Sequence, residues 1–182
     1  MLSHQETETR RQESLELFRQ AGIIVTPQEA AALEIADFGL GEFATTGLGV
    51  LVYVNTSRCC AKELTLLPGQ TCPEHRHPPL AGEPGKEETF RCRWGEVYLY
   101  VPGPAAASPR ARLPEHRRGK VTVWHEIVLR PGDQYTLQPN TLHWFQGGPR
   151  GAVVSEFSTR SRDEADIFTD PDIQRITQIA DR

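Results

Sequence analysis

The sequence lacks any apolar run that approaches the roughly 20 residues of a membrane-spanning helix. Its first residues, Met1 to Arg11, are polar and charged, which argues against a secretory signal peptide. The net charge of the 182 residues is -4, whereas binding to nucleic-acid phosphates requires clustered basic surface. We therefore expect a protein that has neither a membrane nor a nucleic acid as its partner.

Cysteine is also scarce, with four residues and no C-x-x-C pair. This argues against a zinc-thiolate site and against a thioredoxin-like redox site. Because no signal peptide is recognised, we expect a cytoplasmic location. In that reducing compartment the four thiols should remain free. They belong to Cys59, Cys60, Cys72 and Cys92.

The chain begins with helical patterns. Leu15 and Phe18 share one face of a helix predicted over residues 10–20. The stretch Thr26-Pro27-Gln28-Glu29 is a capping box with proline at the first helical position, and it predicts a second short helix that reaches about Leu33.

From residue 48 onward the pattern changes to short segments rich in β-branched and aromatic residues. Turn dipeptides such as Pro68-Gly69 and Trp94-Gly95 separate these segments. Many short strands at this spacing predict an all-β sandwich or barrel. The predicted strands are 48–54, 61–67, 89–93, 96–101, 121–129, 135–138, 143–146 and 152–158, and one short helix is expected after Pro171.

These patterns divide a single domain into three parts. Residues 1–37 are expected to form a helical segment that packs on or beside the barrel. Residues 38–160 form the barrel itself, and residues 161–182 form a C-terminal extension. The basic, proline-rich loop at 102–120 is interpreted as a solvated hairpin tip rather than a phosphate-binding loop.

Three histidines and one glutamate are candidate metal ligands. His75 and His77 are two residues apart, so on a strand both side chains point to one face. Glu88 opens the next strand, and His143 follows a Pro-Asn-Thr turn far along the chain. Three imidazoles and one carboxylate inside a barrel suit a first-row divalent ion with open coordination positions. Any one of these histidines taken alone is better explained by ordinary hydrogen bonding, and Glu87 is an alternative ligand to Glu88.

The spacing of these residues resembles the two cupin motifs. Five residues separate Gly69 from His75, and six separate Glu88 from Gly95. The second motif is represented by Gly132, Pro139 and His143. The longer interval between His77 and Glu88 marks residues 78–86 as an insertion. Threonine stands at position 141 where the motif has glycine.

Longer stretches resemble the D-lyxose isomerases of the cupin superfamily over nearly all of residues 38–172. These stretches are GEFATTGLGVLVYVNT, CAKELTLLPGQTCPEHRHPP, GKEETFRCRWGEVYLYV and NTLHWFQGGPRGAVVSEFSTRSRDEADIFTDP. The resemblance implies an all-β cupin fold (a jelly-roll barrel or sandwich) with short N-terminal helices. It also implies a metal-dependent aldose–ketose isomerase that interconverts D-lyxose and D-xylulose, and also D-mannose and D-fructose. It further implies manganese as the metal, and we expect a homodimer.

An isomerase of this kind needs a base beside the sugar carbons, and strand parity indicates candidates. Glu156 alternates with Ala152 and Val154, so it is expected to face inward as the base. The alternatives are a structural ion pair between Glu156 and Lys62, or the opposite parity with Phe157 inside. The resemblance also indicates a glutamate base at this place.

Two lysines and one tryptophan complete the expected site. Lys62 shares a face with Leu64 and Leu66, so its ammonium should point inward and could hold developing negative charge on the sugar. Lys86 is expected to bind substrate from the rim. Of the adjacent Trp144 and Phe145, one should form an apolar wall for the sugar and the other should pack in the core, and Trp144 is assigned to the sugar. His125 is expected in the core, and Glu126 and Asp163 have no assigned role.

Three other functions are compatible with the motifs alone. An iron-dependent cupin oxygenase would use a similar ligand set, but Glu156 and Lys62 would have no obvious role in it. A phosphosugar isomerase would need a cluster of phosphate-binding side chains that the sequence does not reveal. A non-catalytic sugar-binding cupin would bind metal and sugar without turnover.

Overall fold

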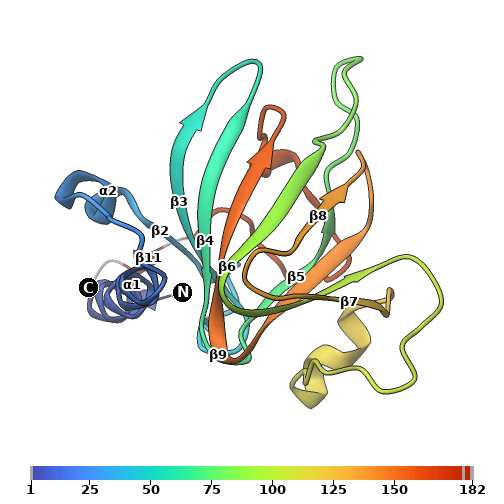
Figure 1. Ribbon diagram of the computed structural model, residues 1–182, viewed down its shortest axis with the longest axis horizontal. Coiled ribbons are helices and arrows are strands. Elements are labelled where there is room, and N and C mark those ends of the chain that lie inside the picture. The colour runs from blue at the N-terminus through green and yellow to red at the C-terminus, as the bar shows by residue number, and fades with distance from the viewer. Residues whose placement is uncertain (1, 178, 181–182) are drawn as a thin grey trace.

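The protein is described here from a computed structural model that covers residues 2–177 and 179–180. A curled sheet dominates the described chain, and helix α1 lies across its outside (Figure 1). The described part has a nine-stranded sheet with the path β10-β5-β9-β4-β3-β2, and β6 pairs with β9 and also with β7 and β8. The strands of this sheet are β2 (Glu34–Ala36), β3 (Leu48–Asn55), β4 (Cys60–Leu66), β5 (Thr71–Arg76), β6 (Glu88–Val101), β7 (His125–Leu129), β8 (Gln134–Leu137), β9 (His143–Ser158) and β10 (Ile167–Phe168).

Strands β6 and β9 are long, and bends let each of them serve both halves of the barrel. One half of β9 pairs with β5 and the other half pairs with β4, while β6 runs along its opposite edge. The sequence predicted two strands in place of each, because Trp94-Gly95 and Gly147-Gly148 resemble turns. In the structure these glycines lie within continuous, bent strands. Gly95 has φ +73°, and a Cβ there would lie 2.0 Å from the carbonyl oxygen of Gly151.

The cupin fold expected from the motifs is the fold that the structure has, and the two N-terminal helices are also present. Helix α1 (His4–Gln20) starts earlier than predicted, because Ser3 and Glu6 form a capping box that the sequence reading missed. Helix α2 (Pro27–Ala32) has the predicted capping box of Thr26 and Glu29. The three-part division of the chain remains a prediction. Strand β2, at the end of residues 1–37, pairs with β3 and belongs to the sheet.

Three apolar clusters hold these elements together. One fills the barrel and includes Leu64, Phe90 and Phe145. A second joins α1 to the sheet through Phe18 and Leu51. The third lies under the loop between β6 and β7 and contains Tyr98, Tyr100, Ala111 and Trp144. Apolar burial on the two sides of β9 therefore positions the residues at its start.

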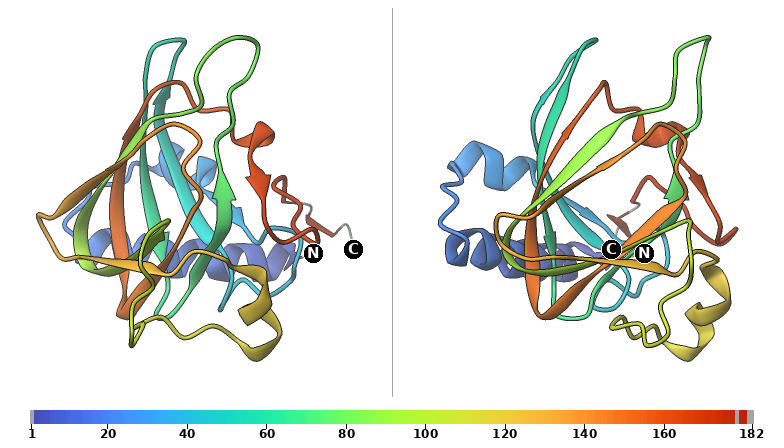
Figure 2. Two further views of the ribbon diagram at one scale, coloured as in Figure 1. Left: turned by 90° about the vertical axis from the view of Figure 1, so that its right-hand side faces the viewer. Right: turned by 45° about the vertical axis from the view of Figure 1, so that its right-hand side comes forward.

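The C-terminal part of the chain differs from the prediction. No helix follows Pro171 within residues 171–177, and a short 3-10 helix, η2 (Asp163–Ala165), lies before it instead. Strand β10 then pairs with β5, and Figure 2 shows this segment beside β5 on the side of the barrel away from α1. The short strands β1 (Leu2–Ser3) and β11 (Ile179–Ala180) pair in parallel.

Two smaller predictions concern strand length and cysteine. Residues 121–124 precede β7 rather than forming part of it, and a 3-10 helix, η1 (Glu115–Lys120), lies in the basic loop. All four cysteines are free thiols, as expected, and three of them are buried. Neither helix of the described chain has the length and apolar character needed to cross a membrane.

Candidate active site

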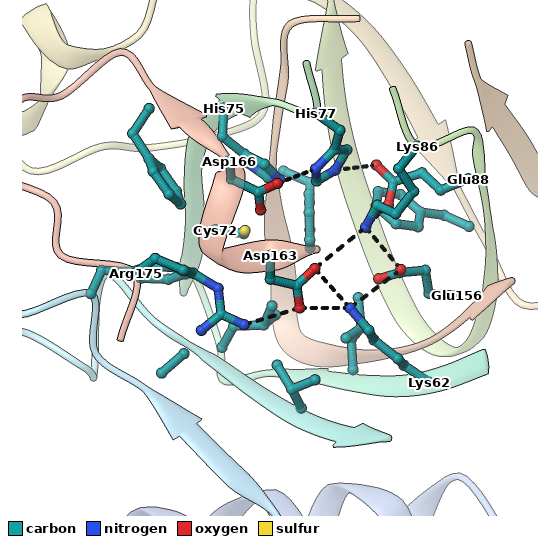
Figure 3. Close-up of a pocket in the computed structure, with 18 residues that line it drawn as sticks. Lys62, Cys72, His75, His77, Lys86, Glu88, Glu156, Asp163, Asp166 and Arg175 are labelled. Carbon is teal, nitrogen blue, oxygen red and sulfur yellow. Dashed lines mark hydrogen bonds and ion pairs between the residues drawn. The ribbon is translucent and has the colours of Figure 1, made fainter. Parts of the chain in front are cut away.

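A pocket lies inside the barrel (Figure 3). One side of it is apolar and is formed by residues such as Val50, Leu64 and Phe145. The other side is strongly polar. It carries two histidines, three cationic side chains and four carboxylates, namely His75, His77, Lys62, Lys86, Arg175, Glu88, Glu156, Asp163 and Asp166.

The three predicted histidines lie together. His75 on β5 is directly opposite His143 on β9, and His77 follows the end of β5. One nitrogen from each of the three imidazoles can be chosen so that all lie within 4.8 Å of one another. All three side chains are buried. Buried imidazoles at this spacing could hold a metal ion.

Glu88 lies against the same cluster at the start of β6. Its Oε1 is 3.0 Å from Nε2 of His77 and 3.1 Å from Nε2 of His143. The contact with His143 lacks hydrogen-bond geometry, so this buried nitrogen has no hydrogen-bond partner among the described residues. An unsatisfied buried nitrogen is costly unless a ligand engages it. The residues present therefore fit a divalent ion.

The protonation states around the cluster follow from burial and charge. Burial, together with the neighbouring histidines, lowers the pKa of His75 well below its ordinary value, which keeps that ring neutral. Burial also acts to lower the pKa of His77, but Glu88 and Asp166 raise it to about 9. Metal binding through Nε2 of His77 must therefore release a proton at neutral pH.

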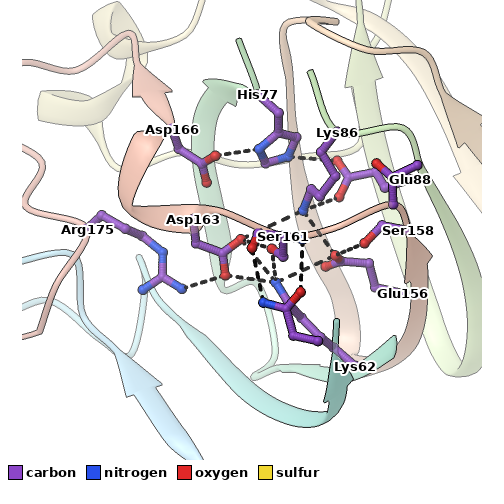
Figure 4. A network of polar contacts seen from close by, with 12 residues as sticks. Lys62, His77, Lys86, Glu88, Glu156, Ser158, Ser161, Asp163, Asp166 and Arg175 are labelled. Carbon is purple, nitrogen blue, oxygen red and sulfur yellow. Dashed lines mark hydrogen bonds and ion pairs between the residues drawn. The ribbon is translucent and has the colours of Figure 1, made fainter. Parts of the chain in front are cut away.

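A network of lysines and carboxylates adjoins His77 (Figure 4). Nζ of Lys86 lies 2.7 Å from Oε2 of Glu88 and 3.0 Å from Oε1 of Glu156. Nζ of Lys62 lies 3.6 Å from the same Glu156 oxygen. Burial alone would lower the pKa of Lys86, but the surrounding carboxylates raise it well above its ordinary value. This ammonium is therefore charged and joins the histidine cluster to Glu156.

Lys62 makes its shortest contacts with residues that follow β9. Its Nζ lies 2.8 Å from Oγ of Ser161 and 2.8 Å from Oδ2 of Asp163. Lys62 and Glu156 are register partners on β4 and β9, so the inward parity expected for both is the one observed. The ion pair that was considered as their alternative is also present, although at the longer distance of 3.6 Å.

Three functional candidates were not assigned from the sequence, and all lie in a segment that we call the C-terminal strap, residues 159–175. Asp163 binds Lys62 and also Arg175, with 3.2 Å between Asp163 Oδ2 and a guanidinium nitrogen. Asp166 binds Nδ1 of His77 at 2.5 Å. Short-range patterns gave no signal for these residues, because their position depends on the pairing of β10 with β5.

The structure does not bring Trp144 to the pocket. Its indole is fully buried in the cluster outside the barrel, where it stacks on Tyr100 with ring centroids 4.0 Å apart and donates to the carbonyl of Val123. Alternation along β9 explains this correction, because His143 faces inward and Trp144 therefore faces outward. Phe145 forms part of the apolar wall of the pocket instead.

Two other residues considered from the sequence also lie outside the pocket. His125 is partly exposed and contacts the carbonyl of Pro104 at 3.0 Å, so it is not a core residue. Glu126 accepts hydrogen bonds from Tyr100 and Arg110 on the outer side of the barrel. Glu87 is exposed, whereas Glu88 lies in the cluster.

The chain is similar in sequence to isomerases of free sugars, although no family model matches it. It is 58% identical over 179 residues to a D-lyxose ketol-isomerase of Thermofilum sp., covering 98% of this chain and 99% of that protein. It is 62% identical over 166 residues to a D-lyxose/D-mannose isomerase of Thermosediminibacter oceani, covering 91% and 92%.

Solved structures share the fold. An L-ribose isomerase of Cellulomonas parahominis aligns with a TM-score of 0.78 at 20% identity over 94% of both chains. An L-ribose isomerase of Acinetobacter sp. DL28, solved with L-ribose, aligns with a TM-score of 0.77 at 18% identity, again over 94% of both chains.

Proposed function

The chain belongs to the D-lyxose ketol-isomerase family, and from that premise we propose that it interconverts D-lyxose and D-xylulose, and also D-mannose and D-fructose. It is an aldose–ketose isomerase. The observation that carries the proposal is the position of Lys86, which contacts Glu88 at 2.7 Å and Glu156 at 3.0 Å. The metal-binding cluster, which would polarise the sugar carbonyl, and Glu156, which would accept a proton, therefore face the same pocket.

The metal ligands in this proposal are His75, His77, Glu88 and His143. A divalent ion held there would act as a Lewis acid on the sugar carbonyl and on the hydroxyl next to it. Sets of imidazole and carboxylate ligands accept several first-row ions, and we propose manganese. The close approach of Glu88 to two of the histidines supports the inclusion of its carboxylate in the set.

Glu156 acts as the base. It removes the proton from C2 of the aldose, the C–H electron pair becomes the second bond between C1 and C2, and the carbonyl oxygen O1 gains negative charge. Return of the proton to C1, with transfer of the O2 hydroxyl proton to O1, yields the ketose. The side chain of Glu156 is only 5% exposed, which keeps bulk water from competing for this proton.

Lys86 and Lys62 stabilise the enediolate. Both ammonium groups are buried and charged, because nearby carboxylates raise the pKa of each above its ordinary value against the effect of burial. Lys86 is the nearer of the two to the histidine cluster, so it is the one to donate a hydrogen bond to a sugar oxygen that gains charge. Lys62 adds a second positive charge beside the same Glu156 oxygen, at 3.6 Å.

The charge of the pocket favours an unphosphorylated sugar. Its three cations, Lys62, Lys86 and Arg175, already bind carboxylates. A phosphate group would therefore meet no unpaired lysine or arginine side chain among the described residues that line the pocket. This observation disfavours the phosphosugar alternative.

We also propose a homodimer and a cytoplasmic location. Strand β2 pairs with β3 only as far as Val50, so one edge of the remainder of β3 has no strand partner within the described residues. Val52, Tyr53 and Val54 are exposed there, with exposed fractions of 47%, 45% and 39%. An apolar edge of this kind is usually covered, and a second copy of the chain would cover it. Four free thiols are consistent with a reducing compartment.

An anaerobic assay of metal-stripped protein, with and without added Mn²⁺, tests the function. The substrates are D-lyxose, D-mannose and their phosphorylated counterparts, and formation of ketose is measured. We expect ketose from the free sugars only when Mn²⁺ is present, and little from the phosphorylated sugars. Absence of ketose from every sugar, in protein that has bound Mn²⁺, would contradict the proposal.

A further inference from the structure

The three histidines of the cluster are oriented in two different ways. Nδ1 of His75 lies 2.8 Å from the carbonyl oxygen of Pro73, and Nδ1 of His143 lies 2.9 Å from that of Thr141. A carbonyl oxygen can only accept a hydrogen bond, so Nδ1 of each ring carries the proton and Nε2 presents its lone pair. For both rings the orienting group is backbone two residues earlier in the same chain segment.

His77 is oriented by a distant side chain instead. Its Nδ1 lies 2.5 Å from Oδ1 of Asp166, which is 89 residues later in the chain. The Asp166 side chain is only 6% exposed. A carboxylate that accepts the Nδ1 proton of a histidine directs Nε2 toward a metal and makes the ring a stronger ligand.

The C-terminal strap holds Asp166 in this position through its pairing with β5. Phe168 is the register partner of His75, and its ring stacks on the His75 ring with centroids 5.3 Å apart. Before Asp166, the single turn of η2 ends with a hydrogen bond of 3.2 Å from the Asp166 backbone nitrogen to the carbonyl of Asp163. The position of Asp166 is therefore defined on both sides, by η2 and by β10.

We propose that Asp166 is a positioning residue of the metal site, which sets the orientation and the basicity of His77 and thereby the affinity for the metal. The inference rests on the proposed function, since it takes His77 as a ligand. It makes metal binding depend on the C-terminal strap through His77, whereas Nδ1 of each of the other two histidines bonds to a backbone carbonyl of its own segment.

Calorimetric titration of metal-stripped protein with Mn²⁺ tests the proposal. We expect Asp166→Ala to weaken Mn²⁺ binding by about 10- to 100-fold. Asp166→Asn should fall between Asp166→Ala and the wild type, because its amide oxygen can still accept the Nδ1 proton but carries no charge. Turnover of both variants should return toward the wild-type value when Mn²⁺ is saturating.

Glu164→Gln is the matched control, because Glu164 is an exposed acidic residue two positions earlier in the strap. It should leave the Mn²⁺ affinity unchanged. Thermal unfolding of each metal-free variant separates effects on folding from effects on the site, and Asp166→Asn, which is nearly isosteric, serves if Asp166→Ala does not fold. Wild-type Mn²⁺ affinity in folded Asp166→Ala or Asp166→Asn overturns the inference alone. Failure of the wild type to bind Mn²⁺ overturns the proposed ligand set instead.

Discussion

At the scale of single residues, the ammonium group of Lys86 separates the two glutamates that the proposed mechanism uses. Glu88 lies beside the histidines, while Glu156 lies on the far side of the Lys86 ammonium group, which contacts both glutamates. Burial acts to raise the pKa of Glu88, but Lys86 and His77 lower it well below its ordinary value. Glu88 is therefore ionised and suited to bind metal, and we assign the role of base to Glu156, which faces the same pocket.

This division of roles predicts the effect of Glu156→Gln. The variant keeps the shape of the side chain but cannot accept a proton, so kcat should fall by about 10²- to 10⁴-fold while Mn²⁺ binding stays at the wild-type level. Calorimetry and a ketose assay measure the two properties. Glu87→Gln, at an exposed position next to Glu88, should change neither. Turnover close to that of the wild type in Glu156→Gln would assign the base to another residue.

Alternation along strands accounts for which of these residues could be predicted from the sequence. The inward parity of Lys62 and Glu156 follows from their apolar neighbours on β4 and β9, and the structure has the same parity. Parity also distinguishes Phe145 from Trp144 once His143 is taken as inward-facing. The assignment of Trp144 to the sugar did not apply that rule, and Trp144 lies in the apolar cluster outside the barrel.

At the scale of elements, the C-terminal strap completes a site that the barrel strands leave open. It is attached to the barrel at several points. Asn55 exchanges two hydrogen bonds with the backbone of Ser161, and Thr169 donates from its backbone nitrogen and its hydroxyl to Glu74. Its contributions could not be predicted from local sequence, because they depend on contacts with strands about 90 to 100 residues earlier.

The ion pairs of the strap predict how its attachment responds to acid. Burial acts to raise the pKa of Asp163, but Lys62, Lys86 and Arg175 lower it below the value of an unfolded chain. A lowered folded-state pKa contributes stability that is present above the unfolded pKa of about 3.9 and is lost as the pH falls toward the folded value. Metal-free protein should therefore lose stability below about pH 4.

Urea unfolding of metal-free wild type and Asp163→Asn at pH 7, 5 and 3 measures this contribution. At pH 7 the variant should be less stable by about 1–3 kcal/mol, because its cations lose a charged partner. Between pH 5 and pH 3 it should lose less free energy of unfolding than the wild type. Asp172→Asn removes an exposed carboxylate and serves as the control. An equal loss between pH 5 and pH 3 in Asp163→Asn and the wild type would contradict the assignment.

At the scale of the whole molecule, the edge of β3 beyond Val50 has no strand partner among the described residues, and this predicts the state of association. The wild type should sediment as a dimer, and Tyr53→Lys should sediment as a monomer, because a charge at the β3 edge opposes burial against a second copy. Ile24→Lys changes an isolated residue with an exposed fraction of 88% and should remain a dimer. A monomeric wild type, or a dimeric Tyr53→Lys, would exclude this edge as the interface.

The sequence predicted the barrel more accurately than it predicted which strands are continuous. Turn dipeptides and β-branched segments indicated the barrel, and the spacing of Gly69, His75, Glu88 and Gly95 indicated the cupin motif. The same turn rule wrongly divided β6 and β9, because a glycine that relieves a close backbone approach looks like a glycine in a turn. Local patterns therefore identify strands, while long-range pairing decides which of them are continuous.

The central claim is that a carboxylate of the pocket carries a proton between two carbons of the sugar. The most direct test is to equilibrate D-lyxose with the manganese-loaded protein in D₂O over many turnovers and to examine the D-xylulose by NMR. The account predicts deuterium at C1 of the ketose, because the proton held by Glu156 exchanges with solvent between turnovers. Ketose that forms in full but contains no deuterium would mean that hydrogen passes directly between the carbons, and it would contradict the account.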